Sequence, residues 1–321
     1  MSEPNLTGYG LWIAAAVLLG AAFFLLYGRK RIGLAAVVRT LALTVPLGLI
    51  GARLLYVALR IKWFQEIGLE NILWPMTEEH FYWGDAQGFA LWGAVGGAAL
   101  AALLAAKRSG KKAGEVMDAL APAAALTIAL CRFGEFLIGE GVGPEVENEA
   151  LWFFPVAVSN EWSSQYAVFM YEGFTALVIL AMLLTWGRRY AGGDRARLFL
   201  ILYSATQVLL ESLRRDSFLA WQFLRVSQLI CALVLAGMML AALARRKRPE
   251  GAALRKGPVV PVAGGLFLAV VGFVVWLEFA IDKSAVLELG TAYLLEAVSC
   301  VALGVTSALV ILPKKAGGRE K

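Results

Sequence analysis

The sequence predicts an all-α polytopic membrane protein whose N-terminus lies outside and whose C-terminus lies inside the cell. Three observations predict this class. The chain of 321 residues is 60% hydrophobic and only 17% charged. Apolar runs of about 20 residues, the length that crosses a bilayer as a helix, recur along it. Its basic residues are distributed unevenly between alternate loops. Such a composition excludes a soluble domain built around one core.

Nine apolar runs are long enough to be spans. They cover residues 11–27, 36–59, 87–106, 114–138, 164–187, 198–213, 226–244, 259–281 and 291–312. No Lys or Arg precedes the first run, so it lacks the basic region of a cleaved signal peptide. We therefore expect the first run to remain as a span.

The orientation follows from the basic residues of the loops. Those after the first, third, fifth, seventh and ninth runs hold 21 of the 30 Lys and Arg, and the opposite side holds six. Because loops rich in Lys and Arg stay inside, the N-terminus is predicted outside. The net charge of +6 is then a topology signal and an affinity for anionic lipid heads of the bilayer. We expect no nucleic-acid partner.

Two outward loops are too long for simple turns. Residues 60–86 are rich in aromatic residues and suit amphipathic arms in the outer interface. Residues 139–163 are acidic, without Lys or Arg, and suit a small extracytoplasmic cap. Simple aromatic anchoring at the interface is the alternative for both loops. A boundary in the basic loop 245–257 divides a core, 1–245, from two further helices and a basic tail, 257–321.

Charged residues inside the spans are the main functional signal. Arg132 and Glu135 are spaced i,i+3 at the end of the fourth run, and Glu140 follows about two turns on. Ionisable groups at such depth are costly, so they are a functional-site hypothesis by default. A structural ion pair between helices is the alternative.

Three further polar groups fall in outer halves of spans. Arg53 lies in the second span, and Ser164-Gln165 with Tyr171-Glu172-Gly173 lie in the fifth. One face of the sixth span carries Tyr203, Gln207, Glu211 and Arg214. Guanidinium groups match phosphate oxygens, and carboxylates can bond hydroxyls or take a proton. The set therefore suits an anionic phospholipid head.

Other chemistries find little support. The single histidine, His80, lies in the outward loop 60–86, and no cysteine cluster or CxxC pair is present among Cys131, Cys231 and Cys300. A zinc or iron site has no ligand set, so we expect no metal and no cofactor. No GxSxG or Walker sequence occurs. A glycine group in the third span, Gly93, Gly96 and Gly97, indicates a close helix-packing face.

These stretches, in this order, resemble the prolipoprotein diacylglyceryl transferase family. The run Arg132-Phe133-Gly134-Glu135-Phe136 with Glu140 is similar to the family's signature GRxGNFxNxE. The resemblance extends over roughly residues 8–240. Its further matches are Tyr9-Gly10, Gly51-Ala52-Arg53 with Tyr56, Ala121-Pro122, Ser164-Gln165, Glu172-Gly173, the Tyr203, Glu211 and Arg214 face, and Gln228.

The resemblance implies a seven-span core with outer arms and a head segment, here followed by two additional helices. It implies transfer of diacylglycerol from phosphatidylglycerol to the lipobox cysteine of prolipoproteins, in the bacterial plasma membrane. The resemblance implies Arg132 and Glu140 as catalytic residues. Glu135 stands where the family has an asparagine, and we add it as a candidate because its carboxylate, one turn from Arg132, could act as the base or neutralise Arg132. The candidate lipid-binding residues are Arg132, Arg53, Gly134, Tyr203, Gln207, Glu211 and Arg214.

The sequence also departs from the family pattern. Trp92-Gly93-Ala94 stands where the family has HGG, so its histidine is missing, and Gln207 stands where it has an arginine. These departures keep open a lipid-binding paralogue that does not transfer, or a transferase with another lipid or acceptor. A transporter with similar helical patterning is a third reading, although no inverted repeat is evident.

Overall fold

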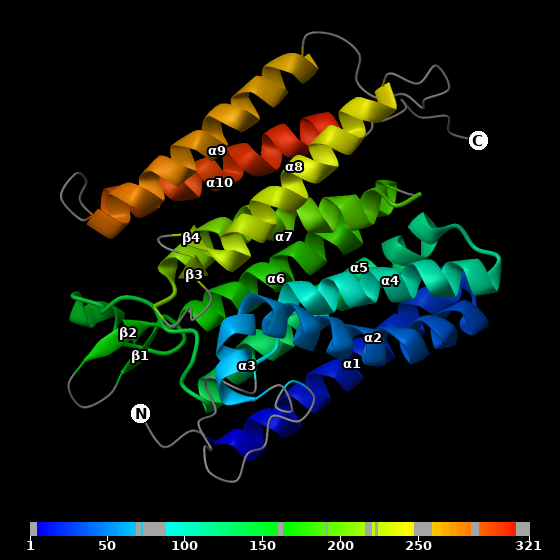
Figure 1. The fold of residues 1–321 in the computed structure, drawn as a ribbon, viewed down its shortest axis with the longest axis horizontal. Helices are drawn as coiled ribbons and strands as arrows, with labels where there is room; N and C mark the ends of the chain where they lie inside the picture. Colours follow the sequence, from blue (N-terminus) through cyan, green and yellow to red (C-terminus); the bar gives the residue numbers. More distant parts are fainter. Residues whose placement is uncertain are drawn as a thin grey trace. The chain divides into compact units, whose positions relative to one another are not determined.

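The computed structural model describes residues 5–68, 72, 88–159, 163–190, 192–215, 220–221, 224–246, 259–283 and 289–312. Within these residues eight helices are long and apolar enough to cross a membrane. The predicted all-α polytopic class is therefore confirmed (Figure 1). The chain forms two compact units, one of residues 23–120 and one of residues 1–22 with 121–321.

The unit of residues 23–120 is organised around two helices in close contact, α2 (Leu34–Leu59) and α4 (Leu91–Ser109). A Cβ added at Gly93 would lie 2.2 Å from the Gly51 carbonyl oxygen, and one at Gly97 would lie 2.0 Å from the Leu47 carbonyl oxygen. The predicted packing role of these two glycines is thus confirmed. It is wrong for Gly96, whose added Cβ would meet nothing within 4 Å.

The count of nine spans needs one correction. The predicted span 87–106 is α4, which is not among the eight helices that qualify as spans in the described residues. Its sequence is mostly Ala and Gly and ends with Lys107 and Arg108. It is therefore less apolar than its neighbours although it is 19 residues long.

The loop 60–86, which the sequence predicts to face outward, begins as a short helix, α3 (Ile61–Ile67). Phe64 is fully buried and its ring meets that of Tyr56 edge-on, with centroids 6.4 Å apart. Most of the predicted arm, including His80, lies outside the described residues.

In the other unit, the first half of α1 (Leu6–Ile32) packs on α5 (Ala113–Gly134). The contact is close, since a Cβ at Gly134 would lie 2.3 Å from Cδ1 of Trp12, and one at Gly20 would lie 1.9 Å from the Thr127 hydroxyl. The Trp12 indole N–H donates to the Leu130 carbonyl oxygen at 2.6 Å. The end of α5 is thereby anchored to the N-terminal helix.

The predicted cap over 139–163 contains a small antiparallel sheet. Strands β1 (Ala157–Ser159) and β2 (Ser164–Tyr166) pair with Val158 opposite Gln165. Two 3-10 turns, η2 (Glu135–Leu137) and η3 (Glu149–Leu151), precede them. The expected start of the fifth span at residue 164 is wrong, because residues 164–166 hydrogen-bond as a strand and α6 begins only at Val168 (Val168–Thr185).

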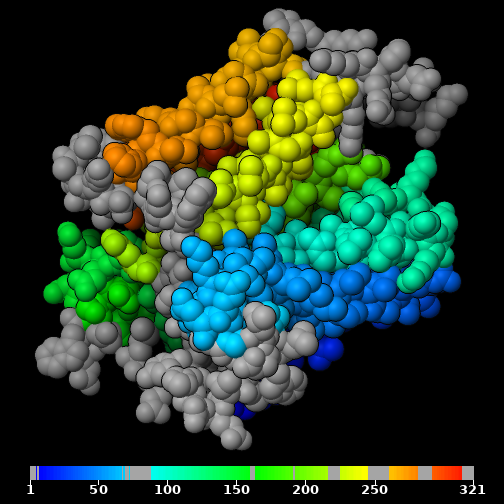
Figure 2. Space-filling view, viewed as in Figure 1, coloured from blue at the N-terminus to red at the C-terminus, as the bar shows by residue number. Residues whose placement is uncertain are grey.

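The remaining helices of this unit follow α6 in order. After η4 (Trp186–Arg189) come α7 (Asp194–Leu213), the hairpin of β3 (Ala220–Trp221) and β4 (Leu224–Arg225), and α8 (Val226–Arg246). The chain continues with α9 (Val259–Lys283) and α10 (Leu289–Ile311). Helix α10 packs on α9, α7 and α8, and little of it is visible between α8 and α9 in Figure 2.

Candidate active site

The candidate site lies where four segments of the larger unit meet. Arg132 is in the last turn of α5, and Glu135 opens η2 directly after it. Glu172 lies near the start of α6, and Arg214 caps the C-terminal end of α7. Each of these side chains therefore comes from the same kind of place, the end of a membrane helix, where the backbone turns.

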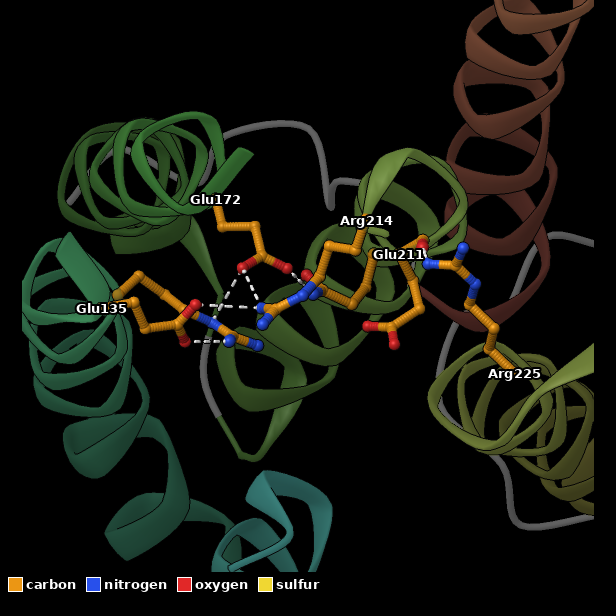
Figure 3. Close-up of polar contacts among 7 residues, drawn as sticks. Glu135, Glu172, Glu211, Arg214 and Arg225 are labelled. Atoms are coloured by element: carbon orange, nitrogen blue, oxygen red, sulfur yellow. Dashed lines mark hydrogen bonds and ion pairs between the residues drawn. The ribbon is translucent and has the colours of Figure 1, made fainter. Parts of the chain in front are cut away.

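These four side chains form a closed ring of alternating charge, here called the charge ring. Nε of Arg132 lies 3.1 Å from Oε2 of Glu172, and its Nη1 pairs with Oε1 of Glu135. Nη1 of Arg214 lies 3.1 Å from Oε2 of Glu135 and 3.0 Å from Oε2 of Glu172. Figure 3 shows Glu135, Glu172 and Arg214 converging in this way. Each guanidinium thus contacts both carboxylates, and the ring is neutral.

The burial of the ring explains its alternation. The side chains of Arg132, Glu135, Arg214 and Glu172 are only 16%, 9%, 10% and 2% exposed. A charge removed from water is costly unless it is paired, and removal of one partner leaves the other uncompensated. In the charge ring no charge depends on a single partner.

The two carboxylates are held differently. Glu172 accepts a third hydrogen bond, from Nε2 of Gln207 to its Oε1 at 2.6 Å. Glu135 carries only its two arginine partners among the contacts that the structure defines. Glu172 is therefore the more firmly fixed carboxylate, and Glu135 is the one freer to change its partner.

A glycine lets the backbone approach Glu135. Gly141 has φ +74°, and a Cβ there would lie 2.4 Å from Oε2 of Glu135. The Gly141 carbonyl oxygen accepts the Phe169 N–H at 2.8 Å, which ties this loop to the start of α6. Both the backbone conformation and the space require glycine at this position.

The structure brings together most of the residues that the sequence placed in one site. Arg132, Glu135 and Arg214 are in the charge ring, Gln207 donates a hydrogen bond to it, and Tyr203 is buried on the same helix as Gln207. Glu172, which the sequence marked as a polar residue of the fifth span and as part of a family match but not as a site residue, is a central member of the ring. Its spacing gave no sign of this, because its partners lie 40 and 42 residues away along the chain.

Three other predicted site residues, Glu211, Gly134 and Glu140, are not members of the charge ring. Glu211 is buried one turn before Arg214, and its carbonyl oxygen accepts a bond from Arg225 (Figure 3). Gly134 packs against Trp12. The Glu140 backbone N–H donates to the Glu135 carbonyl oxygen at 3.3 Å.

Arg53 belongs to the unit of residues 23–120. Its guanidinium donates to the carbonyl oxygens of Ile72, at 2.9 Å, and Gly88, at 3.1 Å. It also lies 5.3 Å from the centre of the Phe64 ring. Trp92 is in the same unit.

In the described part of the chain, no three His, Cys, Asp or Glu side chains gather in a way that could hold a metal ion. The fold and the site together define an integral membrane protein with a buried arginine–carboxylate centre at the ends of its helices.

Comparison with known proteins identifies the family. The family model for prolipoprotein diacylglyceryl transferase matches residues 2–243, so the chain belongs to that family. It is a multi-pass protein of the plasma membrane. The match ends before α9, so the last two helices lie beyond the part shared with the family.

Curated relatives agree with this assignment. A phosphatidylglycerol–prolipoprotein diacylglyceryl transferase of Parasynechococcus marenigrum (strain WH8102) is 29% identical, covering 76% of this chain and 92% of its own. One of Prochlorococcus marinus (strain MIT 9303) is 28% identical, covering 65% of this chain and 74% of its own. One of Streptococcus pneumoniae serotype 4 is 26% identical over 63% of this chain and 76% of its own.

Proposed function

We propose that this protein transfers a diacylglyceryl group from phosphatidylglycerol to the lipobox cysteine thiol of prolipoproteins. One structural observation supports a role for particular residues in this reaction. Within the region that the family model matches, two buried arginines share two carboxylates at the ends of the membrane helices. Such a centre offers both cations for a phosphate and a carboxylate for a proton.

The reaction is a substitution at a glycerol carbon. The sulfur of the acceptor cysteine attacks the carbon that carries the phosphate, and a carbon–sulfur bond forms as the carbon–oxygen bond breaks. The electron pair of the broken bond leaves with the phosphate, as glycerol phosphate. The protein must therefore stabilise negative charge on the leaving phosphate and accept the thiol proton.

Arg132 and Arg214 are suited to the phosphate. A guanidinium donates two parallel hydrogen bonds to phosphate oxygens, and a donor aimed at charge that develops in the transition state commonly accelerates a reaction about 10²–10³-fold. In the structure, however, both arginines are neutralised by Glu135 and Glu172. The phosphate must compete with a carboxylate for them.

Glu135 is suited to resolve this competition. When Glu135 accepts the thiol proton it becomes neutral, and its attraction for Arg132 and Arg214 falls. The arginines are then free to hold the phosphate while Glu172, fixed by Gln207, keeps them in place. Deprotonation of the thiol and stabilisation of the leaving group become one coupled change, which does not need the imidazole that the family has and this chain lacks.

The test follows labelled diacylglycerol from phosphatidylglycerol to a lipobox peptide. Arg132→Lys should lower the transfer rate about 10²-fold or more, because a lysine cannot present the planar fork that serves both carboxylates and phosphate. A matched control is Arg197→Lys, since Arg197 forms an i,i+3 pair with Asp194 and its side chain is 30% exposed. Transfer that is unchanged in Arg132→Lys contradicts the proposed role of Arg132.

A lipid-binding protein without transferase activity is the second candidate. The neutral charge ring favours it, as does Trp92 at the position of the family's histidine. This candidate predicts phosphatidylglycerol bound to the purified protein with no transfer above background. Growth of a strain that lacks its own transferase, restored by this chain and not by its Arg132→Ala variant, contradicts it.

A further inference from the structure

The two helices beyond the family match carry two buried carboxyl groups. Glu278 of α9 is 7% exposed and Glu296 of α10 is fully buried. Both helices belong to the larger unit, where α10 packs against α7 and α8. Neither carboxyl group takes part in the charge ring, and neither has a role in the proposed reaction.

Glu278 is joined to the core by a side-chain amide. Nε2 of Gln228, on α8, donates to Oε1 of Glu278 at 2.6 Å and to the Val208 carbonyl oxygen of α7 at 3.0 Å. The side-chain amide oxygen of Gln228, Oε1, accepts the backbone N–H of Arg225 at 3.4 Å. One amide thus connects α7, α8 and α9, and it gives the Glu278 carboxylate a good donor.

Glu296 is in the opposite situation. Among the residues that the structure describes, no donor reaches either oxygen of its carboxyl group within hydrogen-bond geometry. The groups that face it are the Glu278 carboxyl and, from α7, the Ser212 hydroxyl. The Ser212 oxygen is itself buried and without a hydrogen-bond partner in the same part of the chain. Two carboxyl groups and one hydroxyl, from three helices, are therefore electrostatic neighbours in the buried interior.

The surrounding charges do not supply the missing partner. Arg225, a cationic neighbour of Glu296, donates to the Glu211 carbonyl oxygen. Arg215 follows α7 and is exposed. On α10 itself, the titratable neighbours of Glu296 are Tyr293 and Cys300, which bring no positive charge.

Two neighbouring buried carboxylates, of which Glu296 has no donor among the described residues, are unstable as a pair of anions, because their repulsion adds to the loss of hydration. A proton between them removes one charge and makes the missing hydrogen bond at the same time, as in other carboxyl pairs that share a proton. A hard metal cation is a poorer occupant, since such ions take about six or more oxygen ligands. The described groups offer two carboxyls and one hydroxyl.

We propose that Glu278 and Glu296 form a proton-binding site that holds one proton between the two carboxyl groups. Glu296 carries the proton and donates it to Glu278, whose other interaction is with the Gln228 amide. The site joins α10 and α9 to α7 and α8, and on α7 Ser212 lies two residues before Arg214 of the charge ring. The bound proton then helps to hold α9 and α10 against α7 and α8.

Infrared difference spectroscopy of the purified full chain in lipid nanodiscs tests this directly. A protonated carboxyl group has a C=O stretching band that is absent from a carboxylate and that shifts in heavy water. We expect such a band in the wild-type protein at pH 8, its loss in Glu296→Gln, and a shifted band in Glu278→Gln, because the partner of the shared proton changes. Glu147→Gln, at an exposed residue of the cap, should leave the band unchanged.

Each of three results would overturn the proposal. One is a wild-type spectrum at pH 8 without a protonated-carboxyl band, which needs no variant and does not depend on the folding of one. Another is a band that survives in Glu296→Gln. A band that appears only after sodium is replaced by choline would likewise contradict the proposal, since the resident ligand would then be a metal cation. Transfer activity does not enter the measurement, so its outcome is independent of the proposed function.

Discussion

Replacement of Glu172 by glutamine is expected to destabilise the protein strongly even though the side chain keeps its shape. Glu172 is 2% exposed and interacts with Arg132 at 3.1 Å, Arg214 at 3.0 Å and Gln207 at 2.6 Å. Loss of its charge leaves two buried guanidinium groups facing Glu135 alone. Breaking a buried ion pair from one side costs about 3–5 kcal/mol, so the free energy of unfolding should fall by about that amount.

A second substitution separates charge balance from simple damage. In the double variant Glu172→Gln/Arg214→Gln the ring is neutral again, with one carboxylate for one guanidinium. The double variant should lose less stability than the sum of the two single variants, by a coupling energy of about 1–3 kcal/mol. Titration with a denaturing detergent, followed by tryptophan fluorescence, measures each free energy.

The control for this series is Glu147→Gln, since Glu147 is exposed in the cap. A surface substitution of this kind should change the free energy of unfolding by no more than about 0.5 kcal/mol. If Glu172→Gln is as mild as the control, or if the two single effects simply add, the four charges are not coupled and the closed ring is the wrong description.

Three further predictions concern packing and topology. Gly93→Ala should lower the free energy of unfolding by about 1–3 kcal/mol, because its Cβ would lie 2.2 Å from a carbonyl oxygen of α2. Gly96→Ala is the control and should be neutral, since nothing lies within 4 Å of its added Cβ. Equal effects of the two substitutions would contradict this prediction. Gly141→Ala should lower transfer more than Gly110→Ala, since both have positive φ but only Gly141 faces a carboxylate at 2.4 Å. A cysteine at Glu147 should react with a membrane-impermeant maleimide on intact cells. Reaction only after permeabilisation would reverse the predicted orientation.

The presence of the membrane helices was predictable from the sequence, because an apolar run of about 20 residues predicts a transmembrane helix whatever its tertiary contacts. The run at 226–244 is α8 almost to the residue. The boundary at 164 was not predictable in the same way. Ser164 and Gln165 adjoin an apolar run, and only their pairing with residues 157–159, which a hydropathy pattern cannot register, makes them a strand.

The candidate site was predictable in part for a similar reason. The i,i+3 spacing of Arg132 and Glu135 is local, and the structure has the expected ion pair. The role of Glu172 and the contact of Arg214 with both carboxylates depend on how α5, α6 and α7 pack. This packing cannot be predicted from the spacing of residues along the chain. The neutrality of the ring follows from that packing, and it is what suggests a proton-linked mechanism.

The central claim is that Glu135 accepts the thiol proton and thereby releases the arginines to the phosphate. Steady-state transfer by Glu135→Gln, with varied phosphatidylglycerol, tests it most directly. The predicted result is a kcat lowered about 10²-fold or more with a KM for the lipid that is unchanged or lower, because the glutamine leaves the arginines more attractive to phosphate. A kcat within twofold of the wild type would contradict the claim.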